Sequence, residues 1–252
     1  MMTKPLDQKP ELQEYYQDQS VVDAYMKKRT GQPLNGVLHR RQVEFLSAGI
    51  GGATPRRILE IACGPGRLTA DVRGVSFGVA VDFSPGMLAT ARRRTSNGSG
   101  RWSFARTDAF GLPFRDATFD VVYTLRFVRH FQIEDRERLY AEISRVLRPG
   151  GVFMVDALNR TVSQAHRDEQ GADHYKIYDV LYDRAELERE LTEAGFRVRS
   201  IEGMVKHHSV QRNLNRLRRF RLDWLVTPVI AALEHVPSAQ PHGWMVACEK
   251  IG

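Results

Sequence analysis

The chain has 252 residues, of which 42% are hydrophobic and 27% are charged, an ordinary composition for a globular protein with a sizeable core. Its net charge of +7 is concentrated, because residues 205–226 hold six basic residues and one acidic residue, which leaves the rest close to neutral and argues against a broad nucleic-acid-binding surface. Two cysteines, a polar N-terminal segment and the lack of an apolar run of ~20 residues exclude a disulfide framework, a signal peptide and a membrane span, and predict a cytoplasmic protein.

The N-terminal segment, residues 1–50, is predicted to form a helical cap. Apolar residues recur at helical spacing in 21–29 and 38–46, and the breaker-rich run 31–36 separates the two stretches.

Strands and helices alternate from residue 56 onward, in what we interpret as one domain over residues 1–252 with a cofactor-binding core at 56–160. The fold class is therefore α/β, with a Rossmann-like, seven-stranded, mostly parallel sheet and helices on both faces. We expect strands at 57–62, 76–83, 102–107, 119–125, 152–157, 196–202 and 243–250, and helices at 66–73, 85–95, 134–148 and from Asp183 to Gly195.

A glycine turn follows the first strand, and acidic residues follow the next two. The turn holds Gly64 and Gly66 but lacks the third glycine of G-x-G-x-x-G, which disfavours a dinucleotide. Asp82 ends the second strand, where its carboxylate can accept hydrogen bonds from a ribose diol. Asp108 and Ala109 follow the third strand, where a carboxylate and an amide can read an adenine edge.

These features occur together with further motifs, in one order and spacing. The motifs are Ile58-Leu59-Glu60-Ile61-Ala62-Cys63-Gly64-Pro65-Gly66, Val79-Ala80-Val81-Asp82-Phe83-Ser84-Pro85-Gly86-Met87-Leu88, Asp108-Ala109 with Leu112-Pro113-Phe114, Phe119-Asp120-Val121-Val122 and Leu147-Arg148-Pro149-Gly150-Gly151. In them the chain resembles the class I S-adenosylmethionine-dependent methyltransferases, in particular the group that includes the quinone-biosynthesis methyltransferases.

The resemblance implies S-adenosyl-L-methionine as cofactor, S-adenosyl-L-homocysteine as product and a set of residues that hold them. Asp82 would bind the ribose hydroxyls, Phe83 would flank the adenine, and Asp108 would meet its amino group. Ala62 stands where the family often has glycine. The cofactor-binding residues implied are Glu60, Ala62, Gly64, Gly66, Asp82, Phe83, Met87, Asp108, Ala109 and Leu125, with Tyr25 and Arg29 of the cap near the cofactor carboxylate.

Several residues carry two interpretations each. His130, in the loop after the fourth strand, is either a general base or a structural residue, and Arg126 either orients an acidic acceptor or is a solvated cation. Tyr25 and Arg29 share a helix face, which is also what an ordinary amphipathic helix would show. Tyrosines 175, 178 and 182 form either an acceptor pocket or core packing, and no histidine has metal-ligand spacing, so we assign no metal.

Residues 205–241 form a predicted helical insert before the last strand. Leucines, Phe220 and Trp224 recur there at helical spacing, with arginines on other faces. The insert is compatible with a surface helix, an acceptor lid, dimer contact, or peripheral membrane contact through 212–236.

We therefore predict a methyltransferase that acts on a small-molecule acceptor through an O, N or C nucleophile. No nucleic-acid partner is expected. The alternatives are an RNA methyltransferase that uses the arginine-rich insert and a non-catalytic cofactor-binding protein.

Overall fold

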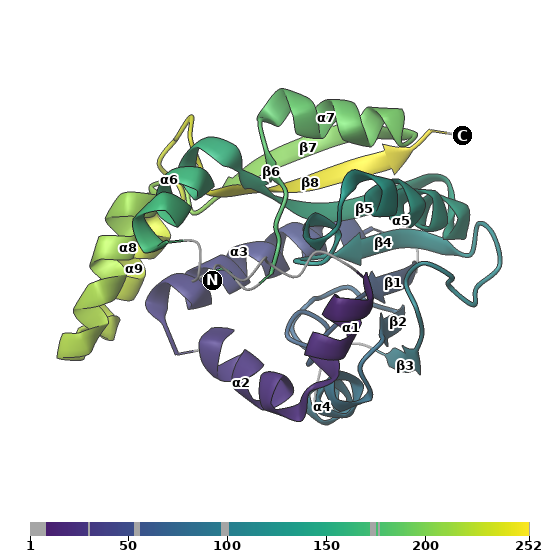
Figure 1. Ribbon diagram of the computed structural model, residues 1–252, viewed down its shortest axis with the longest axis horizontal. Helices are drawn as coiled ribbons and strands as arrows, with labels where there is room; N and C mark the ends of the chain where they lie inside the picture. The colour runs from purple at the N-terminus through teal and green to yellow at the C-terminus, as the bar shows by residue number, and fades with distance from the viewer. Residues whose placement is uncertain are drawn as a thin grey trace.

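The protein is an α/β structure built on one twisted sheet (Figure 1). The computed structural model describes residues 9–29, 31–52, 56–96, 101–171, 175 and 177–251, and for residues 27–29 the backbone only. Seven strands follow the spatial order β3-β2-β1-β4-β5-β8-β7, and the two-residue β6 pairs with β5 beside this path. This confirms the predicted fold class.

The strands from β3 to β5 are parallel, and β8 runs antiparallel to both β5 and β7. The carboxyl ends of the parallel strands therefore meet at one edge, where ligands bind in open α/β sheets. The strands are β1 (Arg57–Ile61), β2 (Phe77–Asp82), β3 (Trp102–Arg106), β4 (Phe119–Thr124), β5 (Leu147–Asn159), β6 (Leu181–Tyr182), β7 (Phe196–Met204) and β8 (Gly243–Lys250).

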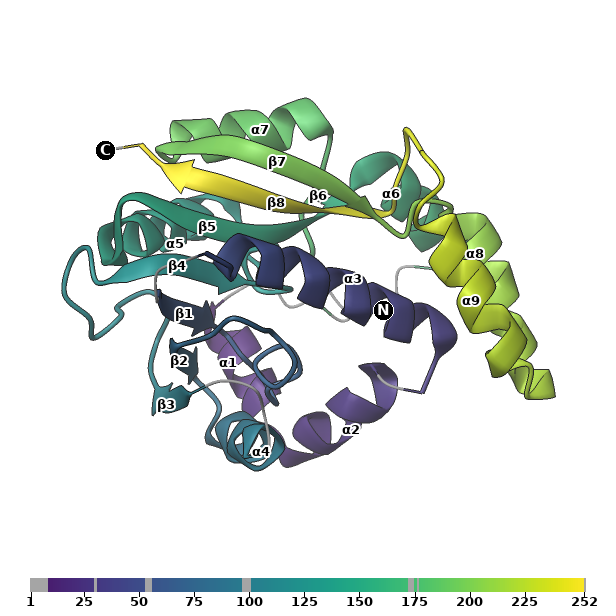
Figure 2. The ribbon, with the colours of Figure 1, turned by 180° about the vertical axis from the view of Figure 1, so that it is seen from behind.

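Helices cover both faces of the sheet (Figures 1 and 2). On one face, α3 (Pro33–Ile50) packs Leu46 and Ile50 against Ile58 of β1, and α4 (Pro85–Thr95) packs on β2 and β3. On the other face, α5 (Ile133–Val146) and α7 (Arg184–Glu193) bury leucines and isoleucines against β5 and β7. The two apolar layers hold the strand ends, and so the loops that follow them, in fixed positions.

Local signals set several helix boundaries. Ser84 caps α4 by accepting a hydrogen bond from the Met87 amide, and Pro85 occupies the first helical position. Asp183 and Glu186 form a capping box at the start of α7. Both helices were predicted from these residues.

The structure corrects three expectations. Residues 66–73 form a run of turns rather than a helix, because the chain makes only a few helical hydrogen bonds, such as the Ala70 amide to the Gly66 carbonyl, before it bends into β2. The strand β5 is longer than predicted. The sequence also did not predict α1 (Lys9–Gln17), α6 (Arg160–Gln170) or β6.

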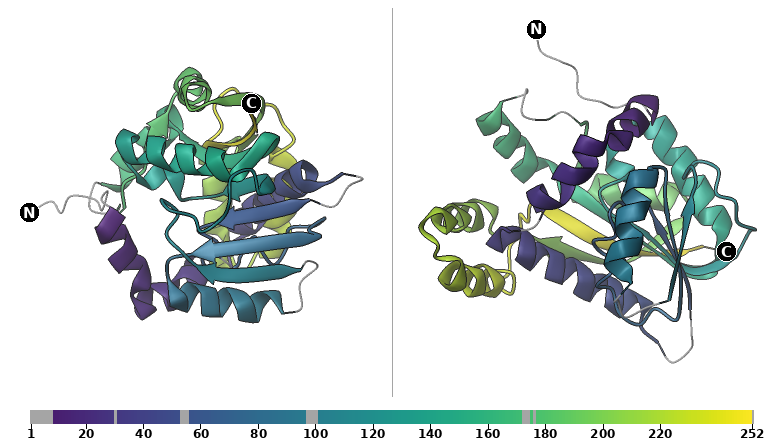
Figure 3. Two further views of the ribbon diagram at one scale, coloured as in Figure 1. Left: turned by 90° about the vertical axis from the view of Figure 1, so that its right-hand side faces the viewer. Right: turned by 90° about the horizontal axis from the view of Figure 1, so that it is seen from below.

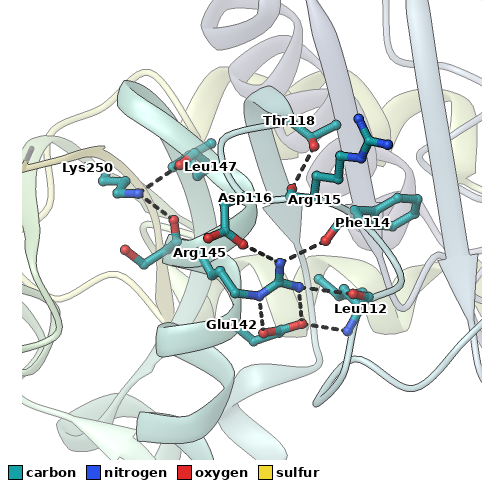
Figure 4. A network of polar contacts seen from close by, with 10 residues as sticks. Leu112, Phe114, Arg115, Asp116, Thr118, Glu142, Arg145, Leu147 and Lys250 are labelled. Atoms are coloured by element: carbon teal, nitrogen blue, oxygen red, sulfur yellow. Dashed lines mark hydrogen bonds and ion pairs between the residues drawn. The ribbon is translucent and has the colours of Figure 1, made fainter.

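The loop between β3 and β4 is fixed to α5 by one arginine (Figure 4). The Arg145 guanidinium donates to the carbonyl oxygens of Leu112 and Phe114 and pairs with Glu142, whose carboxylate also accepts the Leu112 amide. The predicted motif at 112–114 therefore has a structural role, since it holds the loop that begins at Asp108.

The N-terminal helices lie at the carboxyl edge of the sheet, and the insert lies beyond them. α1 and α2 (Gln19–Arg29) cover that edge, whereas α8 (His208–Arg216), the 3-10 turn η3 (Leu217–Phe220) and α9 (Asp223–Leu233) form a helical hairpin that packs beside α3 (Figure 3). No helix among the described residues is long and apolar enough to cross a bilayer.

Candidate functional site

A pocket of about 870 Å³, part of it open to solvent, lies at the carboxyl ends of β1, β2, β3 and β4. Its walls come from the loops after these strands and from α1 and α2. It brings together most of the residues predicted from the sequence, namely Tyr25, Ala62, Gly64, Asp82, Phe83, Met87, Asp108, Ala109, Leu125, Arg126 and His130.

Asp82 and the glycine turn form one end of the pocket. The Gly64 amide donates to Asp82 Oδ2 at 2.8 Å, and the Ser84 amide donates to Oδ1 at 2.9 Å. Burial raises the pKa of Asp82, while these two backbone donors lower it. Each carboxylate oxygen keeps lone pairs for a further donor, as two vicinal hydroxyls would require.

The turn brings the backbone close to the pocket. Ala62 and Gly64 both have positive φ, 54° and 55°, and a Cβ built on Gly64 would meet no protein atom within 4 Å. The left-handed conformation explains why glycine suits position 62, since alanine pays a steric cost there of about 1 kcal/mol. Gly66 does not face the pocket. A Cβ built on Gly66 would come within 2.9 Å of Ala91 in α4. Its role in this structure is close packing of the turn on α4.

Asp108 follows β3, which is separated from β1 and its glycine turn by β2, and it is paired with the N-terminal cap. Lys9 Nζ of α1 is 2.6 Å from Asp108 Oδ2, and the same ammonium sits 4.5 Å from the centre of the Phe110 ring. The other carboxylate oxygen accepts the Phe110 amide. Lys9 of α1 thus covers the part of the pocket that Asp108 lines. The sequence patterns did not predict this contact.

Glu60 lies behind the pocket rather than on its surface. It is 3% exposed, and its Oε2 accepts hydrogen bonds from Thr69 Oγ1 at 2.6 Å and the Tyr123 hydroxyl at 2.9 Å. Burial raises its pKa to about 7, against the opposing effect of the two hydrogen bonds. The Glu60 carboxyl therefore supports the glycine turn from the protein interior.

The other end of the pocket is formed by the loop after β4. Arg126 adopts a left-handed conformation with φ 59°, and its amide donates to Asp156 Oδ1 of β5 at 2.5 Å. A non-glycine residue in this region is uncommon and marks a segment held by its surroundings. The bend exposes Leu125, Arg126 and Phe127 to the pocket.

His130 ends the 3-10 turn η1 (Val128–His130) and lines the same end of the pocket. Its Nδ1 lies 2.9 Å from the Tyr178 carbonyl oxygen and 3.0 Å from Asp179 Oδ1. Since both neighbours are acceptors, Nδ1 carries the proton in the neutral ring, and Nε2 holds the free lone pair. This is the arrangement of a base held in orientation by a carboxylate.

Asp179 joins His130 to a buried set of charges. Its Oδ1 is 2.9 Å from Arg129 Nε, and its Oδ2 accepts from Arg167 at 2.8 Å, while Arg129 also pairs with Asp156. Burial alone would raise the pKa of Asp179, but Arg129 and the hydrogen bond from His130 hold it below its usual value. Asp179 is therefore ionised next to the imidazole at neutral pH.

The tyrosines considered as an acceptor pocket lie outside it. The Tyr182 hydroxyl donates to Glu190, Tyr178 contributes its backbone carbonyl, and the Tyr175 ring lies under the Arg167 guanidinium. The Arg29 side chain lies outside the described residues. Among the residues that the structure does describe, no group of three or more His, Cys, Asp or Glu side chains is arranged to hold a metal ion.

Comparison with known proteins agrees with the motifs and the fold. Residues 58–151 match the model of a methyltransferase domain family. The chain is 39% identical over 104 residues to a demethylmenaquinone methyltransferase of Thermus thermophilus, covering 40% of this chain and 46% of that protein. It is 30% identical over 158 residues to a ubiquinone biosynthesis O-methyltransferase of Azorhizobium caulinodans, covering 59% and 62%.

Solved structures extend the similarity of fold to nearly the whole chain. The magnesium protoporphyrin IX methyltransferase of Synechocystis PCC 6803, solved with bound SAH, superposes with a TM-score of 0.69 at 13% identity, covering 96% of this chain and all of that one. The sequence alignments are shorter, since the chain spans between about two fifths and three fifths of the curated relatives' lengths. Residues 58–151 are therefore a methyltransferase domain, similar to that of the quinone-biosynthesis methyltransferases.

Proposed function

We propose that this protein transfers a methyl group from S-adenosylmethionine to a small-molecule acceptor bound in the pocket, as one domain in which the helical cap closes on the core at 56–160. The observation that carries the proposal is the doubly tethered carboxylate of Asp82 beside the open space at Gly64. This part of the pocket offers the two acceptor oxygens of Asp82 next to a backbone segment, at Gly64, that a ligand can approach closely. The neighbouring structure with bound SAH supports the choice of cofactor.

The pocket residues divide into those that would hold the cofactor and those that would face the acceptor. Asp82, Phe83 and Met87 would hold the ribose and adenine, with Asp108 and the Ala109 amide on the far edge. Ala62, Gly64 and Leu125 would lie along the methionine portion, with Tyr25 and Arg29 of α2 as ligands of its carboxylate. S-adenosylmethionine supplies an electrophilic methyl group on a sulfonium.

The acceptor end combines an apolar wall with one oriented base. Phe127, Phe131 and Tyr16 line it and favour an acceptor with an apolar body, while Arg126 supplies a positive charge. His130 Nε2 would accept the proton that an O, N or acidic C nucleophile loses as it attacks. Placing the acceptor in a pocket that α1 and α2 partly cover would limit the access of water to this reaction.

The names of the relatives support a small-molecule acceptor, since they include quinone-biosynthesis enzymes. An RNA methyltransferase receives no such support. The arginines that motivated that alternative lie on the α8–α9 hairpin, and of the described pocket wall only Lys9 and Arg126 are lysine or arginine.

Binding of S-adenosylhomocysteine to the purified chain tests the proposal. At a hundred times its dissociation constant the product should stabilise the protein by about 2.7 kcal/mol and raise the melting temperature by roughly 5 °C or more. NAD serves as a control with the same adenosine. No shift with S-adenosylhomocysteine, or an equal shift with NAD, would refute the cofactor assignment.

A further inference from the structure

The helix α9 is apolar on two faces. Its inner face buries Val226 and Ile230, at 2% and 0% exposure, against Val37 of α3. Its outer face carries Trp224, which is 75% exposed, together with Leu225. A surface helix normally has one apolar stripe, so the outer face of α9 has no partner among the described residues.

The exposed apolar surface continues into the turn that joins the two helices of the hairpin. Phe220 of η3 is 58% exposed, about as much as a side chain on an open surface. We define the outer surface of the hairpin by its exposed apolar side chains, which are Leu217, Phe220, Trp224, Leu225 and Val229.

A positive charge surrounds this outer surface. Arg216, Arg219 and Arg221 are all exposed, and Asp223 is the one acidic residue between positions 205 and 226. The Arg219 guanidinium lies 4.7 Å from the centre of the Phe220 ring, so cationic and aromatic groups share the same point of the surface.

The hairpin is firmly attached to the domain on its inner side. Arg218 donates to the Gly31 carbonyl at 3.0 Å, while Asn215 accepts the Leu34 amide and donates to Gln32. These bonds tie the end of α8 to the connection between α2 and α3. The outer surface is therefore presented in a fixed orientation, on a hairpin that lies beside the N-terminal end of α3 (Figures 2 and 3).

The positive charge around the outer surface of the hairpin determines which partner can cover it. A symmetric contact between two copies would place the same patch opposite itself, and would bring two clusters of arginines together with one aspartate each. An anionic lipid surface instead accepts the arginines among its headgroups and the tryptophan and phenylalanine at the boundary with the acyl chains.

We propose that the outer surface of the α8–α9 hairpin docks this protein on anionic lipid bilayers. Trp224 and Phe220 insert at the level of the headgroups, and Arg219 and Arg221 contact lipid phosphates. The surface lies outside the pocket, so docking is independent of the proposed methyl transfer.

The test is co-sedimentation of the full chain with vesicles of phosphatidylcholine, alone or mixed with phosphatidylglycerol. Binding should require phosphatidylglycerol and weaken with salt. Trp224→Ser should abolish most of it, and the pair Arg219→Gln and Arg221→Asn should weaken it about thirtyfold, since each arginine near an anionic surface contributes roughly a fivefold factor. Asparagine suits position 221, whose φ is 58°.

Matched controls lie far from the hairpin. Phe77→Ser removes an aromatic ring that is 64% exposed at the start of β2, and Arg189→Gln with Arg197→Gln removes two exposed arginines near α7 and β7. These variants should bind vesicles as the unchanged protein does. The tryptophan fluorescence should shift to the blue on binding, because Trp224 is 75% exposed, whereas Trp244 is buried and Trp102 is partly buried.

Four results would overturn the proposal. Equal binding to neutral vesicles, or binding that the hairpin variants leave unchanged, would remove the charge and the surface from the explanation. A dimer in solution that Trp224→Ser dissociates would make a second copy the occupant. Salt-dependent binding to RNA that exceeds binding to the anionic vesicles, and that Arg219→Gln with Arg221→Asn abolishes, would assign the arginines to nucleic acid.

Discussion

At the β1–β2 end of the pocket the polar groups come from short, contiguous stretches of chain, whereas at the β4 end they come from side chains that meet from distant segments. Asp82 accepts one hydrogen bond from the amide of Gly64, which follows the neighbouring strand β1, and one from the amide of Ser84, two residues further along the chain. His130 depends on Asp179, 49 positions further along, and both belong to a set of buried charges that spans β5 and α6.

This difference matters for function. A site made of backbone amides is fixed by the strands that carry it and suits a ligand that all members of a family share. A site made of buried ion pairs depends on several side chains at once, and each pair must offset the cost of removing its charges from water. We infer that the first end holds the common cofactor and the second is adapted to the acceptor of this protein.

The largest effect is expected from Asp82→Asn, which keeps the shape of the side chain and removes its charge. Two charge-assisted hydrogen bonds to a ribose contribute about 1.5–3 kcal/mol each, so affinity for S-adenosylhomocysteine should fall roughly a thousandfold. Calorimetric titration measures it. Asp71→Asn, which removes an exposed carboxylate paired with His39, is the control and should bind normally. Unchanged affinity in Asp82→Asn would show that the cofactor lies elsewhere.

A smaller and different effect is expected from His130→Asn. The asparagine amide can still donate to the Tyr178 carbonyl oxygen beside Asp179, as His130 Nδ1 does, but it has no group at the Nε2 position. The turnover number should fall about a hundredfold, as for loss of a general base, with little change in affinity for S-adenosylhomocysteine.

The measurement is transfer of labelled methyl to the acceptor, alongside a titration with S-adenosylhomocysteine. Asp168→Asn, an exposed carboxylate on α6 that accepts from Gln164, is the control. If His130→Asn kept full turnover, His130 would be a structural residue, and the distant side chains at this end would serve only to hold the loop. Equal losses of affinity and turnover would also contradict the division between the two ends.

How much of the molecule the sequence could predict follows the same division. The succession of strands along the chain, the cap of α4 and the positions of Asp82 and Asp108 rest on local patterns, and the structure brings Asp82 and Asp108 to one pocket. Asp179 could not be assigned, because nothing near it in sequence shows that Arg129 and Arg167 will surround it. Lys9 could not be assigned either, since α1 closes on Asp108 only through the fold.

One error has a clear physical cause, and one predicted role stays a prediction. Residues 66–73 have helical composition, but Gly66 with φ 72° and its close contact with Ala91 commit the chain to turns instead. Glu60 belongs to a motif that suggests contact with the cofactor, yet its Oε2 faces Thr69 and Tyr123. A motif identifies a segment, and only the packing shows which side chains in it reach the ligand.

Glu60→Gln tests whether the cofactor end of the pocket depends on a buried charge. Its effect is expected to be the smallest of the three substitutions. Glutamine presents the same carbonyl oxygen to Thr69 and Tyr123 without a charge. In the unfolded chain Glu60 ionises near the ordinary glutamate pKa of 4.5, whereas in the folded protein its pKa is about 7, so the folded state binds more protons between these values. The stability contributed by neutral Glu60 is therefore full below pH 4.5 and is lost as the pH rises to about 7.

Urea unfolding of both proteins at pH 5 and pH 8 measures the effect. Relative to the unchanged protein, Glu60→Gln should gain roughly 2 kcal/mol between the two, because the amide avoids the cost of ionising a buried carboxyl. Glu44→Gln, at a carboxylate that is 59% exposed, should show no such dependence. Affinity for S-adenosylhomocysteine should persist in Glu60→Gln. If it fell as far as in Asp82→Asn, Glu60 would contact the cofactor directly, and the cofactor end would also depend on a buried charge.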